Sequence, residues 1–182
     1  MAKSSFWSDH NTEPKRQYRW VLNMGSVDAW LIKKVGKPSF SITESKHQFI
    51  NHSFYYPGRV EWEKISVTLV DPVTPDASKS MEAIVRAAGY KLPTDAQVAQ
   101  NTISKGNSVR ALGNVSIKQI DADGNPIEEW KLTNAWVTSV KFGELDYSSD
   151  EMVEITLELR YDYAELIKDV GNAGVAPASA GY

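Results

Sequence analysis

The feature that most constrains this chain is a stretch near its C-terminus in which apolar and polar residues alternate. The apolar positions are Val153, Ile155, Leu157, Leu159, Tyr161 and Tyr163. The positions between them are Met152, Glu154, Thr156, Glu158, Arg160 and Asp162. Because successive side chains of a β-strand point to opposite faces, this pattern predicts one long strand with an apolar face in a core and a charged face outside it. A chain built around such a strand is expected to be mainly β.

Shorter alternating runs, separated by turn residues, recur along the chain around residues 18–24, 29–35, 39–43, 62–69, 115–117, 127–132 and 136–142. The segment 44–60 is less regular, and residues 91–108 are expected to be a polar connection with a helical turn near 95–100. A helix is predicted from an N-cap at Asp76 to about Ala88, with Met81, Ile84 and Val85 on its apolar face. Together these patterns predict an antiparallel β-sandwich or barrel with one flanking α-helix.

The length of 182 residues suits one domain. We expect an N-terminal arm over residues 1–16, a β domain over residues 17–168, and a flexible C-terminal tail over residues 169–182, which is rich in Gly and Ala. No apolar run approaches the roughly 20 residues of a membrane helix, and residues 1–14 contain no secretory signal. No membrane anchoring is therefore expected, and assembly in a cytoplasm is the default expectation.

The composition argues against several functional classes. The chain has no cysteine, which excludes disulfides and thiolate chemistry. Its formal net charge of −3 does not favour a broad basic surface that grips nucleic acid. Mild acidity is instead compatible with a surface that nucleic acid passes without binding.

No catalytic or metal-binding set emerges from the sequence. The histidines are His10, His47 and His52, and Glu44 is the only carboxylate near the last two. The adjacent acids at 128–129 and 150–151 are interpreted as edge charges, because neighbouring strand residues face opposite ways. The segment Asp121–Asn125 resembles a calcium loop but lacks the distal Glu, so a hairpin turn is favoured. We therefore predict a protein that is not an enzyme and has no cofactor or metal.

An aromatic cluster lies outside the alternating pattern and is followed by a Pro-Gly pair. Because few positive charges accompany it, contact between subunits is a better interpretation than base stacking. The residues predicted at this contact are Phe49, Ile50, Phe54, Tyr55, Tyr56 and Arg59.

Several segments resemble the tail-tube proteins of contractile-tailed, T4-like bacteriophages. They are FYYPGRVEWEKISVTL at 54–69, which precedes the predicted helix, WKLTNAWVTSV at 130–140, GELDY at 143–147 and EMVEITL at 151–157. The resemblance spans about residues 18–165. It implies a structural virion protein whose hexameric rings stack into a tube inside a sheath. Implied partners are the baseplate hub, tube-initiating proteins, the tape-measure protein and the DNA that passes through the lumen.

Other functions stay open at this stage. The inner tube of a bacteriocin or contractile injection system shares the implied fold, and so does a baseplate protein that initiates the tube. A monomeric carbohydrate-binding β-sandwich would also expose aromatic residues. For a tube, the polar face of the last strand is predicted to line the lumen, because it carries three acids against one base. The residues of this face are Glu154, Thr156, Glu158, Arg160 and Asp162.

Overall fold

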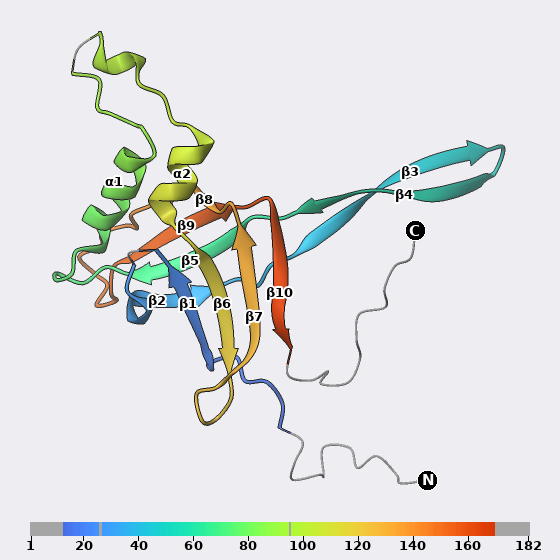
Figure 1. Cartoon of the computed structure of the whole chain (residues 1–182), viewed down its shortest axis with the longest axis horizontal. Helices are drawn as coiled ribbons and strands as arrows, with labels where there is room; N and C mark the ends of the chain where they lie inside the picture. The colour runs from blue at the N-terminus through green and yellow to red at the C-terminus, as the bar shows by residue number, and fades with distance from the viewer. Residues whose placement is uncertain (1–12, 26, 95, 170–182) are drawn as a thin grey trace.

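Two four-stranded antiparallel sheets pack against each other in the structure, a computed structural model that describes residues 13–25, 27–94 and 96–169 (Figure 1). Sheet A has the order β1 (Trp20–Met24), β6 (Val115–Ile120), β7 (Pro126–Thr133) and β10 (Tyr163–Asp169). Sheet B has the order β2 (Ile32–Val35), β5 (Ile65–Val70), β9 (Glu154–Arg160) and β8 (Trp136–Lys141). The predicted antiparallel sandwich is confirmed.

The core lies between the two sheets, and the alternating pattern explains which faces meet. In sheet B, Val67 of β5 pairs with Leu157 of β9, and both side chains are completely buried. Sheet A contributes its own alternating buried residues: Leu22, Met24, Val115, Ile117 and Leu132. Burial of each such side chain stabilises the fold by roughly 1.5–3 kcal/mol. The sandwich therefore has a continuous core of its own.

The prediction of one long strand near the C-terminus is wrong in one respect. The chain bends at Tyr161–Asp162, so that β9 belongs to sheet B and β10 to sheet A. The backbone N–H of Asp162 donates to Thr133 O at 3.0 Å at this corner. The phase of the alternation shifts at this corner: Tyr163, predicted on the apolar face, is 50% exposed, and Ala164 of β10 is buried instead.

The helical region differs from the prediction by one helix. Helix α1 (Ala77–Ala87) begins as predicted, with Asp76 accepting a hydrogen bond from the backbone N–H of Lys79 at 2.9 Å. A second helix, α2 (Lys105–Leu112), packs against α1 and β8, and short 3-10 helices span Ala29–Leu31 and Val98–Gln100. Among the described residues, no helix is long and apolar enough to cross a membrane.

Strands β3 (Phe40–Phe49) and β4 (His52–Trp62) form a two-stranded sheet that extends well away from the sandwich (Figure 1). The sequence predicted a strand only near residues 39–43 and an irregular segment after it. The reason is physical: both faces of this hairpin are open to solvent, so neither strand needs an apolar side and a polar side. We call β3–β4 the projecting hairpin.

Candidate assembly surfaces

The projecting hairpin has two different faces near its tip. The cross-strand partners are Phe49 with His52, His47 with Phe54, and Ser45 with Tyr56. Because partners in an antiparallel pair lie on the same face, these six side chains form one aromatic and histidine-rich face. We call it the aromatic face. The predicted contact residues Phe49, Phe54 and Tyr56 therefore lie together.

The other predicted contact residues lie elsewhere on the same hairpin. Tyr55 is opposite Lys46 on the second face, and Ile50 is in the turn that joins β3 to β4. Arg59 is beside the register shift of β3 and donates its backbone N–H to Thr43 Oγ1 at 2.8 Å. Their contact with a neighbouring subunit stays a prediction, and the strand register assigns these residues to faces of the hairpin.

Large apolar side chains on this hairpin are exposed to an unusual degree. Phe54 is 51% exposed, Phe49 62% and Ile50 76%. A contiguous apolar patch of this kind on a soluble protein marks an interaction surface. An aromatic residue buried at such a surface contributes strongly to binding.

The turn at the tip carries backbone strain. Ile50 has φ +50°, a conformation in which a β-branched residue is sterically disfavoured. A glycine would adopt it without this cost. The two-residue turn that joins β3 to β4 requires a positive φ at its first residue, so this strain follows from the turn geometry.

The root of the projecting hairpin is fixed by aromatic packing. The ring centroids of Phe40 and Trp62 are 5.2 Å apart, and those of Trp62 and Tyr161 are 5.9 Å apart. Tyr161 is buried at the corner between β9 and β10. The direction in which the hairpin projects is therefore set by the core.

Glu128, on β7, is a buried carboxylate that the sequence interpretation had assigned to an edge. It accepts hydrogen bonds from Lys37 at 2.6 Å, from Trp130 Nε1 at 2.6 Å and from Lys15. Burial alone would raise the pKa of Glu128, but the hydrogen bonds from Lys15, Lys37 and Trp130 lower it from 4.5 to about 2. Lys37 lies just before the projecting hairpin, and it also donates to Gln119 at 2.8 Å. Through Glu128, the segment that leads into the projecting hairpin is linked to sheet A.

The outer face of β9 carries ion pairs with neighbouring strands. Glu158 accepts from Lys64 at 3.2 Å, and Glu154 pairs with Lys33. The pKa of Lys33 is raised, first by its hydrogen bond to Glu154. The negative charges of Glu154 and Glu158 on β9 are therefore offset by two lysines. One is Lys33 of β2, and the other is Lys64, the residue before β5.

Asp162 does not continue the outer face of β9, because it lies beyond the end of that strand at the sheet corner. It accepts from Lys105 at 2.7 Å and from Asn134 at 2.7 Å. These bonds, led by that from Lys105, lower the pKa of Asp162. Its role is to link α2 to the turn between β7 and β8.

The other candidates for chemistry are structural. Asp121 accepts from the backbone N–H groups of Asp123 at 2.9 Å and Asn125 at 2.8 Å, which closes the turn between β6 and β7. No group of three or more potential metal-binding side chains occurs in the part of the chain that the structure describes. His47 and His52 lie on the aromatic face, and His10 lies outside the described residues.

The sequence matches one protein family, and the fold is similar to that of chains in several solved structures. The family model of the T4-like virus tail tube protein gp19 matches residues 41–165. A chain from the anti-feeding prophage tube-terminating cap has a similar fold, with TM-score 0.63, 17% identity, and coverage of 92% of this chain and 99% of that one. A chain from the anti-feeding prophage baseplate gives TM-score 0.62, 15% identity, and coverage of 86% and 97%.

A third similar chain comes from the sheath/tube terminator of the extracellular contractile injection system PVC, in its extended state. Its TM-score is 0.60 at 15% identity, with coverage of 86% of this chain and 98% of that one. No curated protein matches the sequence significantly.

Proposed function

Since the chain belongs to the T4-like virus tail tube protein family, we propose that it forms hexameric rings that stack into the inner tube of a contractile phage tail. The tube conducts DNA during ejection into the host. In this role the chain is a virion component that is assembled in the host cytoplasm, and it works without enzymatic activity, metal or cofactor. The observation that carries the proposal is the exposed projecting hairpin.

A single copy exposes the aromatic face at a cost that only assembly removes. Phe49 and Phe54 are more than half exposed, while the core of the sandwich is complete without them. An isolated two-stranded hairpin is only marginally stable in water, so a hairpin of this length is expected to be held by a neighbour. The predicted contact with another subunit, by Phe49, Ile50, Phe54, Tyr55, Tyr56 and Arg59, is retained as a proposal.

The tube also implies other partners. The similar chains come from assemblies described as a baseplate, a tube-terminating cap and a sheath/tube terminator. By this likeness we propose a sheath around the tube and a baseplate at its end. The tape-measure protein and DNA follow as occupants of the lumen from the phage role.

The outer face of sheet B, with Glu154, Thr156, Glu158 and Arg160 of β9, is proposed to line the lumen. Because its two glutamates are paired with lysines, this wall is polar and close to neutral rather than acidic. Such a wall offers no unpaired cluster of positive charge to bind phosphate. Replacing Glu154 and Glu158 with Lys would leave Lys33 and Lys64 unpaired and is expected to slow DNA ejection, most at low salt. Virions of this variant that eject DNA at the normal rate would place this face elsewhere.

A second candidate is the inner tube of a contractile injection system, because the similar chains come from such systems. The two roles differ in what the lumen holds. Purification of assembled particles separates them: DNA inside a capsid-bearing particle supports the phage role, and particles without a capsid support the injection system.

Electron microscopy of the purified chain tests the proposal directly. We expect rings or tubes for the wild type and folded monomers for a variant that carries Phe49→Ser and Phe54→Ser. A matched control changes Gln48 and Ser53, the partners on the opposite face of the same strands, to Ala. This control is expected to assemble. A wild type that stays monomeric at high concentration would favour a monomeric binding module and refute the tube.

A further inference from the structure

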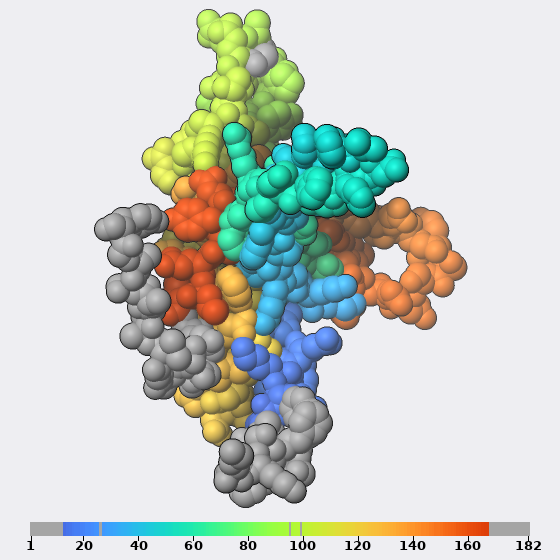
Figure 2. All heavy atoms as spheres, turned by 90° about the vertical axis from the view of Figure 1, so that its right-hand side faces the viewer, coloured from blue at the N-terminus to red at the C-terminus, as the bar shows by residue number. Residues whose placement is uncertain are grey.

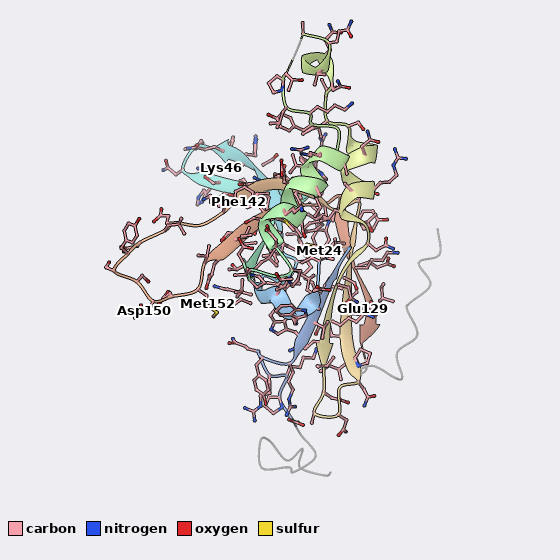
Figure 3. All side chains as sticks on the ribbon, turned by 90° about the vertical axis from the view of Figure 1, so that its left-hand side faces the viewer. Met24, Lys46, Glu129, Phe142, Asp150 and Met152 are labelled. Carbon is pink, nitrogen blue, oxygen red and sulfur yellow. The ribbon has the colours of Figure 1, made fainter. Side chains whose placement is uncertain are left out.

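The loop that joins β8 to β9, residues 142–153, is a second projecting surface, and we call it the acidic loop. It contains Glu144, Asp146, Asp150 and Glu151, and no Lys, Arg or His. Figure 3 shows it standing away from the sheets, with Phe142, Asp150 and Met152 labelled along its course. Its apolar side chains are open to solvent, Leu145 at 88% and Met152 at 66% exposed.

The backbone conformation of the acidic loop is fixed by a glycine and by hydrogen bonds. The backbone at Gly143 has φ +81°, and a Cβ there would lie 2.6 Å from Glu154 O, so the position requires glycine. Asp146 accepts from the backbone N–H of Ser148 at 2.9 Å and from its hydroxyl at 2.8 Å. The N–H of Asp71 donates to Val153 O at 3.0 Å, which fixes the end of the loop to the sandwich.

Within this frame the loop encloses an open hollow. Its volume is about 660 Å³, and residues between Gly143 and Glu154 line it. Figure 2 shows the loop, in orange, as an open ring of atoms at the side of the molecule. A hollow with exposed apolar and acidic residues is suited to a partner that offers apolar side chains together with positive charge.

The tip of the projecting hairpin has the complementary chemistry. Between residues 45 and 56 it carries Lys46, His47 and His52, and no acid. The same segment presents Phe49, Ile50 and Phe54 to solvent. The charge and the apolar character of the two surfaces therefore match.

Within one chain the two surfaces belong to opposite ends of sheet B. The projecting hairpin leads into β5 at Ile65, which pairs with Leu159 at the C-terminal end of β9. The acidic loop leads into β9 at Glu154, which pairs with Val70 at the far end of β5. Six residues of strand, about 20 Å, separate the two ends. A head-to-tail contact between copies is the arrangement that pairs different surfaces and repeats.

We propose that the tip of the projecting hairpin docks on the acidic loop of a second copy of this chain. Phe49, Ile50 and Phe54 enter the hollow, while Lys46 faces the acids of the loop. This inference rests on the proposed function and names the surface that receives the hairpin.

Charge reversal on each side tests the pairing. One variant carries Lys46→Glu and Gln48→Glu, which lie on the same face of the hairpin tip, and the other carries Asp150→Lys and Glu151→Lys. The hairpin variant alone places acids against the acidic loop. The loop variant alone places two lysines near Lys46 and removes the net negative charge of the loop. For each variant we expect the concentration needed for assembly to rise at least tenfold in low-salt buffer. In an equimolar mixture, the acidic hairpin of one variant meets the lysines of the other variant's loop, and the unchanged hairpin meets the unchanged acidic loop. The mixture is therefore expected to assemble within about threefold of the wild-type concentration. Sedimentation velocity measures both quantities.

The chain with all four substitutions is the matched control, because it has the same changes and should assemble by itself. Unchanged melting temperatures show that every variant is folded. If the wild type assembles and either two-substitution variant alone assembles equally well, or if neither the mixture nor the four-substitution chain recovers assembly, the hairpin docks elsewhere and the tube proposal stands. If the wild type itself does not assemble, the proposed function fails first.

Discussion

The sandwich and the projecting hairpin follow the same strand geometry and differ completely in burial. In the sandwich, Val67, Leu69, Ile155, Leu157 and Leu159 are 0% exposed. In the hairpin, every residue of β3 is exposed, and so is every residue of β4 before Trp62. Two regions of one chain thus place apolar side chains in opposite environments.

This difference separates folding from assembly. The sandwich buries its apolar face against itself and needs no partner, whereas the hairpin keeps large apolar residues in solvent. Because the hairpin pairs with no strand of sheets A or B, the aromatic residues near its tip contribute little to the stability of one copy, unlike Phe40 and Trp62 at its root. Their selection is better explained by a contact that forms between copies.

The largest expected effect comes from breaking the sandwich. Leu157→Ala removes a fully buried side chain at the centre of β9 and is expected to lower the free energy of unfolding by about 3–5 kcal/mol. The matched change in the hairpin, Phe54→Ala, should lower it by less than about 0.5 kcal/mol. Urea unfolding of the monomer followed by circular dichroism measures both. If the two substitutions lowered the free energy of unfolding by similar amounts, the claim that the sandwich and the hairpin differ in their contribution to stability would be wrong.

A smaller effect is expected where the two regions are joined. Glu128→Gln weakens the hydrogen bonds with Lys37 and Lys15 and should cost about 1–2 kcal/mol. The matched variant Glu129→Gln, on the opposite face of β7, loses an ion pair with Lys118 at 3.4 Å and should cost less than about 0.5 kcal/mol.

The same pair of variants gives a pH test. The pKa of Glu128 in the folded protein is about 2, below its ordinary value of 4.5. A lowered pKa contributes stability that is complete above pH 4.5 and is lost as the pH falls toward 2. The difference in melting temperature between the wild type and Glu128→Gln should therefore shrink across this window. A difference that stays constant with pH would show that the carboxylate charge is not what stabilises the fold.

The smallest effect on the fold is expected at the hairpin tip. Ile50→Gly relieves the φ +50° strain, so the free energy of unfolding should stay level or rise by up to about 1 kcal/mol. It also removes an exposed apolar side chain from the proposed contact, so the concentration needed for assembly should rise several-fold. Asn51→Gly, at the neighbouring turn position, is the control. An Ile50→Gly variant that assembles as well as the wild type, or better, would exclude a role for this residue at the interface.

The sequence predicted mainly those segments of the fold that have one apolar face and one polar face. The alternation at Ile155, Leu157 and Leu159 predicted a core strand, and the cap at Asp76 predicted the start of α1. Alternation did not reveal the corner at Asp162, because Tyr161 and Tyr163 continue the apolar pattern in the sequence although Tyr163 is exposed in the structure. Helix α2 has few buried positions, chiefly Ser108 and Leu112, and so lacked an apolar stripe.

The candidate surfaces were predictable in composition but not in arrangement. Phe49 and Phe54 are predicted as contact residues because they break the alternating pattern, yet their common face depends on a register that the turn at Ile50 sets. Glu128 gave no signal, since its partners Lys15 and Lys37 are 113 and 91 residues away in sequence. Such long-range contacts follow from the fold and are not encoded by local spacing.

The most direct test of the central claim removes the projecting hairpin and keeps the sandwich. Residues 44–58 would be replaced by an Asn-Gly turn that joins Thr43 to Arg59, which are already in contact. We predict a monomer that melts within a few degrees of the wild type and forms no rings or tubes under the electron microscope, at a concentration where the wild type forms them. A trimmed chain that still assembles as the wild type does, or that no longer folds, would contradict the claim that the sandwich folds alone and the hairpin assembles it.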